Sequence, residues 1–305
     1  MPSLFRAAFV QGRPSFGRTD ENLERGLALA EHVGADLVVL PELWSTGYVF
    51  SSRAELAGLA EDPESGATAL ALKAAAKRTK RHYIAGFAEV SHGRYYNSAM
   101  LVGPSGVRTV YRKLHLFERE GEWFERGDLP LSVHTVGAAK VGLMICYDWR
   151  FPEVARVLSL QGAEVIAHPS NLVFPGAQDA MLVRSMENRV YTVTANRTGT
   201  EKRPGGTVPF TGRSQIVDAK GDVLVRASKR DASAQAADLD LSIARDKALT
   251  SRTQLFAPRR PEMYGLLLAT HGVAYPPKAP KPTKATKAPK ATKPGMGTKG
   301  AKGAV

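Results

Sequence analysis

Short apolar runs rich in β-branched residues alternate with amphipathic stretches from the N-terminus to about residue 249. This alternation constrains the fold more than any other feature, because strands and helices in turn along a chain build layered α/β domains. The first units are a strand over 4–11, a helix over 20–33 and a buried strand over 35–40. The sequence therefore predicts an α/β fold.

The same alternation continues through the rest of the chain. Further helices are predicted over 65–80, 151–162 and 177–188. Further strands are predicted over 82–90, 95–102, 107–112 and 139–146, and RSQIVDAKGDVLVRA predicts a hairpin with its turn at AKGD. Two β-rich halves separated by helices suit a sheet-on-sheet core covered by helices, although the strand order does not follow from the sequence.

Positive charge is concentrated at the C-terminal end of the chain. The formal net charge is +13, and residues 277–305 hold eight lysines and no acid. From Pro276 the chain is built from Pro, Lys, Ala, Thr and Gly and cannot bury a core, so we expect a domain over 1–275 and a disordered tail over 276–305. Six of the lysines recur at every third residue and would align on one edge of a polyproline II helix as a contact for a polyanion: Lys278, Lys281, Lys284, Lys287, Lys290 and Lys293.

The cysteine and histidine content limits the chemistry. The chain has a single cysteine, so it forms no internal disulfide and no multi-thiolate zinc site. Its seven histidines lack HxH and HExxH spacing, so no metal is expected. No window approaches the ~20 apolar residues of a membrane span, and the N-terminal apolar run is too short for a signal peptide. We expect a cytoplasmic protein without a membrane contact.

The single cysteine, Cys146, lies where the apolar strand 139–146 gives way to a helix start. First-turn N–H groups and the helix dipole favour a thiolate at such a position, which would make Cys146 a nucleophile. The alternative is a small buried apolar residue, a common fate of a free cysteine.

Two charged residues also follow predicted strands. Glu42 comes after the buried strand 35–40, and a carboxylate beside a thiol can take its proton and return it to a leaving amine. Lys113 follows the strand 107–112, and its ammonium with the amide of Tyr147 would stabilise an oxyanion. The alternatives are a loop-capping or arginine-paired glutamate and a solvated surface lysine.

The segments PELWSTGY, YRKLHLF and GLMICYDWRFPE carry these three residues in order, at separations of 71 and 33 residues. Together they resemble the signature segments of the nitrilase superfamily of carbon–nitrogen hydrolases, over about residues 4–265. The resemblance implies a four-layer α-β-β-α sandwich that forms homodimers, no cofactor, and a thioester on Cys146. It also implies a second glutamate that orients the lysine or the substrate. Glu120 is the best match, with Glu118 and Glu122 as rivals.

Tyr147 and Asp148 after the nucleophile resemble the amidase, ω-amidase and carbamoyl-amine branches, whereas true nitrilases typically carry Trp and Glu there. We therefore expect hydrolysis of a small linear amide with release of ammonia or an amine. Nitrile hydrolysis by the same site and a polyanion-binding module acting through the tail are the alternatives. Four more residues are candidates for the substrate pocket or else for ordinary packing: Trp44, Tyr48, Asn171 and Phe174.

Overall fold

The computed structural model describes residues 4–269. Residues through Pro261 form one compact unit, and Glu262 begins a second, of which residues 262–269 are described. The predicted domain end at 275, the tail over 276–305 and its six lysines lie outside the described residues and stay predictions. None of the helices described has both the length and the apolar character needed to cross a membrane.

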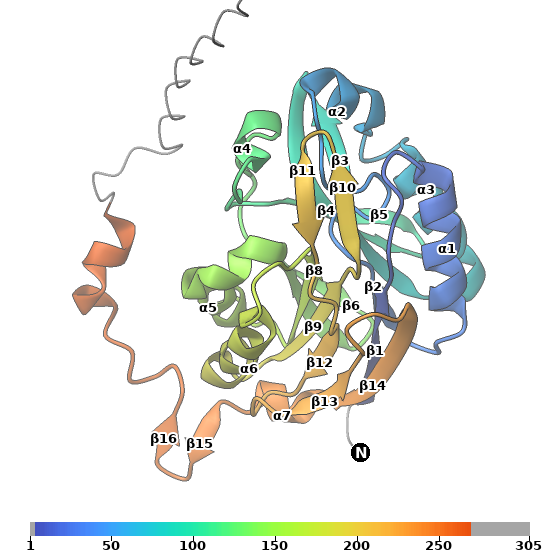
Figure 1. Ribbon diagram of the computed structural model, residues 1–305. Helices are drawn as coiled ribbons and strands as arrows, with labels where there is room; N and C mark the ends of the chain where they lie inside the picture. The colour runs from blue at the N-terminus through green and yellow to red at the C-terminus, as the bar shows by residue number, and fades with distance from the viewer. Residues whose placement is uncertain (1–3, 270–305) are drawn as a thin grey trace, which may run out of the picture. The chain divides into compact units, whose positions relative to one another are not determined.

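Two six-stranded sheets make up the core of the compact unit (Figure 1). The first has the order β14 (Ser233–Asp240), β1 (Leu4–Gln11), β2 (Leu37–Val39), β3 (His82–Ser91), β4 (Arg94–Gly103) and β5 (Gly106–Arg112). The second has the order β13 (Val223–Arg226), β12 (Gln215–Val217), β9 (Tyr191–Asn196), β8 (Val165–Ser170), β7 (Ala139–Leu143) and β6 (Val133–Val136). The strands β1, β2 and β3 pair in parallel, as do β7, β8 and β9, and antiparallel strands flank both sets.

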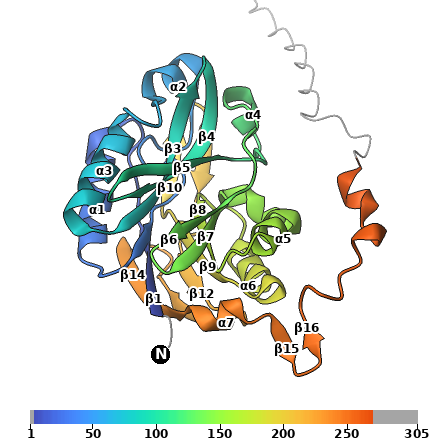
Figure 2. The ribbon, with the colours of Figure 1, turned by 180° about the vertical axis from the view of Figure 1, so that it is seen from behind.

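Helices cover the outer face of each sheet (Figures 1 and 2). The first sheet packs against α1 (Thr19–Glu31) and α3 (Ala67–Thr79), and the second against α5 (Pro152–Leu160) and α6 (Ala177–Asn188). The predicted four-layer α-β-β-α sandwich is confirmed. The remaining elements are α2 (Arg53–Leu59), α4 (Glu120–Trp123), η1 (Cys146–Arg150), β10 (Thr200–Arg203), β11 (Gly206–Pro209), α7 (Leu241–Arg245), β15 (Ala248–Thr250), β16 (Thr253–Gln254), η2 (Pro261–Met263) and η3 (Gly265–Leu268).

Strand β1 shows why the central strands read as unbroken apolar runs. Phe5, Ala7 and Phe9 face the other sheet, whereas Ala8 and Val10 face the helices of the outer layer. Successive side chains of a strand point to opposite faces, so a strand buried on both sides needs apolar residues at every position. The predicted buried strands are confirmed for this reason.

One predicted boundary, near the candidate nucleophile, was inaccurate, and one hairpin was missed. The strand predicted over 139–146 ends at Leu143, because the chain leaves the sheet before Cys146 and begins η1 there. The hairpin predicted at AKGD is confirmed between β12 and β13. The hairpin formed by β10 and β11, with Glu201 on its first strand, was not predicted.

Candidate active site

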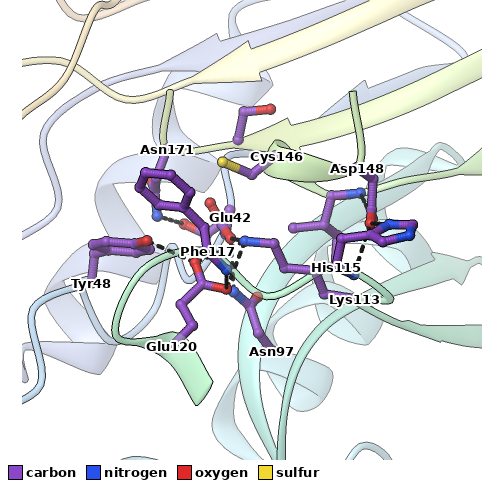
Figure 3. A network of polar contacts seen from close by, with 12 residues as sticks. Glu42, Tyr48, Asn97, Lys113, His115, Phe117, Glu120, Cys146, Asp148 and Asn171 are labelled. Atoms are coloured by element: carbon purple, nitrogen blue, oxygen red, sulfur yellow. Dashed lines mark hydrogen bonds and ion pairs between the residues drawn. The ribbon is translucent and has the colours of Figure 1, made fainter. Parts of the chain in front are cut away.

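Glu42, Lys113 and Cys146 lie together beyond the ends of β2, β5 and β7 (Figure 3). Lys113 Nζ is 2.7 Å from Glu42 Oε1, and the charges of both residues act on the Cys146 thiol. The carboxyl ends of β2 and β7 belong to different sheets, so the site forms where the two sheets face each other. Residues that are 71 and 33 positions apart in sequence are thus brought to one point.

A close approach of two backbones fixes the position of Glu42. The Gly86 amide donates to the Pro41 carbonyl at 3.0 Å, and the Trp44 amide donates to the Gly86 carbonyl at 2.9 Å. A Cβ at position 86 would lie 2.4 Å from the Cα of Glu42, closer than any side chain tolerates. Glycine in β3 therefore allows the turn carrying Glu42 to pack directly against the strand.

Lys113 is held between two carboxylates in what we call the Glu-Lys-Glu cluster (Glu42, Lys113 and Glu120). Its ammonium donates to Glu42 Oε1 at 2.7 Å and to both oxygens of Glu120 at 2.8 Å. All three residues are buried. Asn97 Nδ2 also donates to Glu42 Oε1, at 2.7 Å, whereas the buried Glu42 Oε2 has no partner among the described residues. The cluster carries one net negative charge and leaves one carboxylate oxygen available.

The electrostatics keep Lys113 charged and Tyr48 protonated. Burial lowers the pKa of Lys113, but the charges of Glu120 and Glu42 outweigh burial and raise it well above its usual value. Burial raises the pKa of Glu120, while Lys113 opposes that change. Burial, Glu120 and Glu42 together raise the pKa of Tyr48, so its hydroxyl stays a donor, and it donates to Glu120 Oε1 at 2.7 Å.

The Cys146 thiol is protonated at rest. Burial and the charge of Glu42 raise its pKa well above the usual value, and Lys113 opposes them only in part. The helix start was expected to favour a thiolate, but burial and a neighbouring carboxylate move the pKa of the thiol upward instead. The sulfur can attack only if a base removes its proton.

The backbone of Cys146 is in the left-handed region, with φ of 41°, a strained conformation for a residue with a side chain. His168 Nε2 donates to the Cys146 carbonyl at 2.9 Å. Burial lowers the pKa of His168 to about 4, so the ring is neutral and its Nδ1 accepts from Thr194 Oγ1 at 3.1 Å. The carboxylate of Asp148 accepts from the Ile145 amide at 2.9 Å. These contacts hold the strained turn on both sides of the sulfur.

The Asp148 carboxylate forms further hydrogen bonds with residues outside this turn. It also accepts from Tyr111, and from the ring and amide of His115, whose imidazole stacks on Phe151 with 3.5 Å between ring centroids. Asp148 is fully buried. It therefore ties the segment after β5, which carries Lys113, to the turn that carries Cys146.

Two cavities lined by residues of the described part of the chain flank the site. A cavity of about 10 Å³ lies at the sulfur, and Cys146, Asn171 and Phe174 are among its walls. A larger cavity of about 260 Å³ lies between residues 48–50, the segment 117–124 and the tip of the β10–β11 hairpin. Phe117 lines both cavities, so its ring stands between the nucleophile and the larger space.

The four candidate pocket residues lie in three different places in the structure. Asn171 and Phe174 line the sulfur cavity, and Tyr48 lines the larger one. Trp44 lines neither: its indole N–H donates to the Asn22 carbonyl at 2.6 Å, and its ring packs between the first sheet and α1. We therefore correct the pocket assignment of Trp44 to a core position.

The rival glutamates lie away from Lys113. Glu118 is exposed, and Glu122 pairs with Arg119 at 2.8 Å. Of the three candidate glutamates, Glu120 is the one that contacts the ammonium. Within residues 4–269 no group of three or more His, Cys, Asp or Glu side chains is placed to hold a metal ion.

A buried ion pair behind the site was missed from the sequence. Arg197 Nη1 is 2.7 Å from Glu201 Oε2, and Glu201 Oε1 accepts from the amides of Tyr48 and Val49 at 3.0 and 2.6 Å. The Arg197 guanidinium lies 4.1 Å from the ring centroid of Phe210. The only sequence signal is two opposite charges four residues apart beside an apolar strand. Asn97 was missed because it reads as an ordinary strand residue.

A thiol, a carboxylate and an ammonium at the strand ends of a four-layer sandwich define an enzyme that acts on carbon–nitrogen bonds. The family model described as carbon-nitrogen hydrolase matches residues 6–248, and the chain belongs to this family, within the nitrilase superfamily. The protein is a thiol-dependent hydrolase of carbon–nitrogen bonds other than peptide bonds.

Three relatives illustrate the similarity. A nitrilase from Pyrococcus abyssi is 44% identical over 264 residues, which cover 86% of this chain and 99% of the relative. An (R)-stereoselective amidase from a Pseudomonas species is 40% identical over 230 residues, covering 74% and 81%. The crystal structure of a carbon-nitrogen hydrolase from Helicobacter pylori superposes with a TM-score of 0.77 at 26% identity, covering 88% and 99%.

Proposed function

We propose that the protein hydrolyses a small linear amide, with Cys146 as nucleophile and Glu42 as proton shuttle. The observation that carries this proposal is that the two carboxylate oxygens of Glu42 differ in their hydrogen-bond partners. Oε1 is bonded to Lys113 and Asn97, whereas the buried Oε2 has no partner among residues 4–269. A carboxylate oxygen without a partner beside a protonated thiol is suited to take the thiol proton.

In the first half-reaction, Glu42 Oε2 takes the proton from Cys146 and the sulfur bonds to the carbonyl carbon. The resulting oxyanion is stabilised by Lys113 and by the Tyr147 amide, which is in the first turn of η1 and has no acceptor within that helix. Glu42 then gives its proton to the leaving nitrogen, the carbon–nitrogen bond breaks, and ammonia or an amine departs. A thioester remains on Cys146.

In the second half-reaction, Glu42 Oε2 takes a proton from water while the water oxygen attacks the thioester carbon. The carbon–sulfur bond breaks, a carboxylic acid is released, and the proton returns to the sulfur of Cys146. Glu120 keeps Lys113 in place through both steps, because it accepts two hydrogen bonds from the ammonium. No external oxidant, reductant or cofactor is needed for this balance.

The side chain of Asn171 favours an amide over a nitrile. Its Nδ2 donates to the Glu42 carbonyl at 3.0 Å, and its buried Oδ1 has no partner among the described residues. A carboxamide brings N–H donors that satisfy such an acceptor, whereas a nitrile brings none. We expect Asn171→Leu to lower kcat/KM for acetamide by roughly tenfold and to narrow the preference for amides over nitriles.

The test is an ammonia- and amine-release assay on short amides, ω-amides, N-carbamoyl amines and nitriles, run beside Cys146→Ala. We expect amides to be turned over by the native enzyme and none of the substrates by the variant. Mass spectrometry of the native enzyme after rapid quenching should find an acyl adduct on Cys146. Turnover of nitriles alone, or an adduct elsewhere, would reject the assignment.

We also propose a homodimer that works in the cytoplasm. Apolar side chains are exposed on the outer faces of α5 and α6, in pairs three residues apart: Val157, Leu160, Val183 and Met186. Such a face favours burial against a second copy, and a single thiol used in catalysis favours a reducing compartment. Light scattering of native protein and of Leu160→Glu should give a dimer and a monomer, respectively. Polyanion contact through the tail lysines remains a prediction.

A further inference from the structure

The cavity of about 260 Å³ beside the Glu-Lys-Glu cluster has mainly apolar walls, among them Phe50, Phe117, Trp123 and Phe124. Its charged lining residues are confined to one stretch, Glu118, Arg119 and Glu120. Tyr48 and Glu120 line this cavity, and Glu120 also contacts Lys113, so the cavity adjoins the cluster. With Phe117 as the wall that it shares with the cavity at the sulfur, it is the space that we assign to the remote end of a substrate held at Cys146. The charges of that stretch then decide which remote ends bind.

Among the described residues of the lining, Arg119 is the one cation, and its donors are already bonded to other groups. Arg119 donates through Nε and Nη2 to the two oxygens of Glu122 at 2.9 and 2.8 Å, and through Nη1 to the Gly205 carbonyl at 2.8 Å. A guanidinium in a two-bond pair with a carboxylate is neutralised locally and has its fork occupied. Arg119 is therefore not available to bind a carboxylate on a substrate.

Around the cavity, negative charges outnumber positive charges. Glu118 is exposed and has no hydrogen-bond or ion-pair partner among residues 4–269. Glu120 belongs to a cluster whose net charge is −1. Two net negative charges therefore face or adjoin the cavity. They repel an anionic group and attract an ammonium, and the aromatic walls add to that attraction.

We propose that this cavity selects the remote end of the substrate by charge, and that the preferred substrates are amides with a short apolar chain ending in an ammonium group. The apolar walls take the methylene groups, and Glu118 faces the cationic end. The inference rests on amide hydrolysis at Cys146, which it narrows to a substrate class. Amides that end in a carboxylate are the disfavoured class.

The experiment compares three amides of matched length: 5-aminopentanamide, pentanamide and glutaramate. We expect kcat/KM to fall in that order, with roughly fivefold between the first two, as for a partly exposed charge pair. The difference should appear mainly in KM and shrink at high salt, because the contact is a charge contact near solvent. A preference for glutaramate, or equal rates on all three, would overturn the inference.

Matched variants locate the effect. Glu118→Gln should remove the advantage of 5-aminopentanamide, and Glu118→Lys should reverse the order of the two charged amides. Glu125→Gln removes one charge from the same segment outside the cavity and should keep the native order. If Glu125→Gln and Glu118→Gln act alike, the selection does not come from the cavity and the inference fails.

Pentanamide and acetamide serve as internal standards. Every variant should turn them over as the native enzyme does, which shows that it is folded and that the chemistry is intact. Absence of any amide turnover in the native enzyme would count against the proposed function itself. Turnover of acetamide with the wrong order among the three longer amides would count only against the charge selection.

Discussion

Two buried ion-pair systems lie side by side in this protein and differ in how completely their carboxylate oxygens are bonded. In the Glu-Lys-Glu cluster, one ammonium serves two carboxylates and Glu42 Oε2 has no partner among the described residues. In the pair formed by Arg197 and Glu201, both carboxylate oxygens are bonded and the charges cancel, and the buried atom without a partner among the described residues is a donor, Arg197 Nε. The Glu-Lys-Glu cluster therefore has a carboxylate oxygen left for proton transfer, whereas the pair has none and has only an anchoring role.

Tyr48 connects the two systems. Its amide donates to Glu201 and its hydroxyl donates to Glu120. The neutral pair thus fixes the backbone of the loop whose side chain supports the charged cluster. If the distinction is right, damage to the cluster should abolish turnover, and damage to the pair should mainly lower stability.

The largest effect is expected for Lys113→Met. The substitution leaves Glu42 and Glu120 buried without a cation, so one of them takes up a proton, and the oxyanion loses its charged donor. We expect kcat on acetamide to fall by about 10³-fold. Lys77→Met on the exposed part of α3 is the control and should be neutral. A Lys113→Met enzyme within tenfold of native activity would remove the cluster from the mechanism.

The next effect is expected for Arg197→Met, which leaves the charge of Glu201 buried with only backbone amides. Breaking a buried pair by removing one partner costs about 3 kcal/mol of stability. We expect denaturant unfolding to report that loss, while kcat of the folded variant stays within about tenfold of native. Pairing it with Glu201→Gln should recover part of the stability, since the amide oxygen still accepts from Tyr48. A collapse of kcat at unchanged stability would contradict the anchoring role.

His168 extends the comparison to a buried group that is neutral and has both ring nitrogens bonded. Its pKa in the fold is about 4, below the usual 6.5, so the unfolded chain binds the proton more tightly. Stability is then lost as the pH falls below about 6.5, by about 2 kcal/mol at pH 5. We expect the difference in unfolding free energy between pH 7 and pH 5 to shrink by that amount in His168→Gln. An unchanged difference would mean that His168 does not titrate in this range.

Much of the fold and the three central residues could be predicted because their signals are local. Buried strands read as apolar runs, and Glu42 and Cys146 each follow one, whereas Lys113 follows the partly buried strand β5. The contacts of Glu201 with Tyr48 span 153 residues, and no local pattern reports them. The raised pKa of the thiol also escaped prediction, because it depends on burial and on a carboxylate from another sheet.

Trp44 shows a different limit of prediction from sequence. An aromatic residue beside a candidate catalytic glutamate suits a pocket and a core equally well. Its direction is set by the turn at Leu43, whose φ of 45° swings the following chain against β3. The sequence contains the residues of this turn but not its geometry. An aromatic residue next to a catalytic residue in the sequence is therefore weak evidence for a substrate pocket.

The smallest effect is expected for Tyr48→Phe, which cuts the one side-chain link between the two systems. The variant keeps the backbone bond to Glu201 and loses the hydroxyl bond to Glu120 Oε1, so Glu120 still holds Lys113 through two hydrogen bonds. We expect a loss of about 1 kcal/mol in stability and about three- to tenfold in kcat on acetamide. Measured together with Arg197→Met, the double variant should lose less kcat than the product of the single losses if the systems are coupled through Tyr48, because Tyr48→Phe already removes the route by which Arg197→Met would reach the cluster. Strictly multiplicative losses would show that the anchor and the cluster act independently, although one residue contacts both.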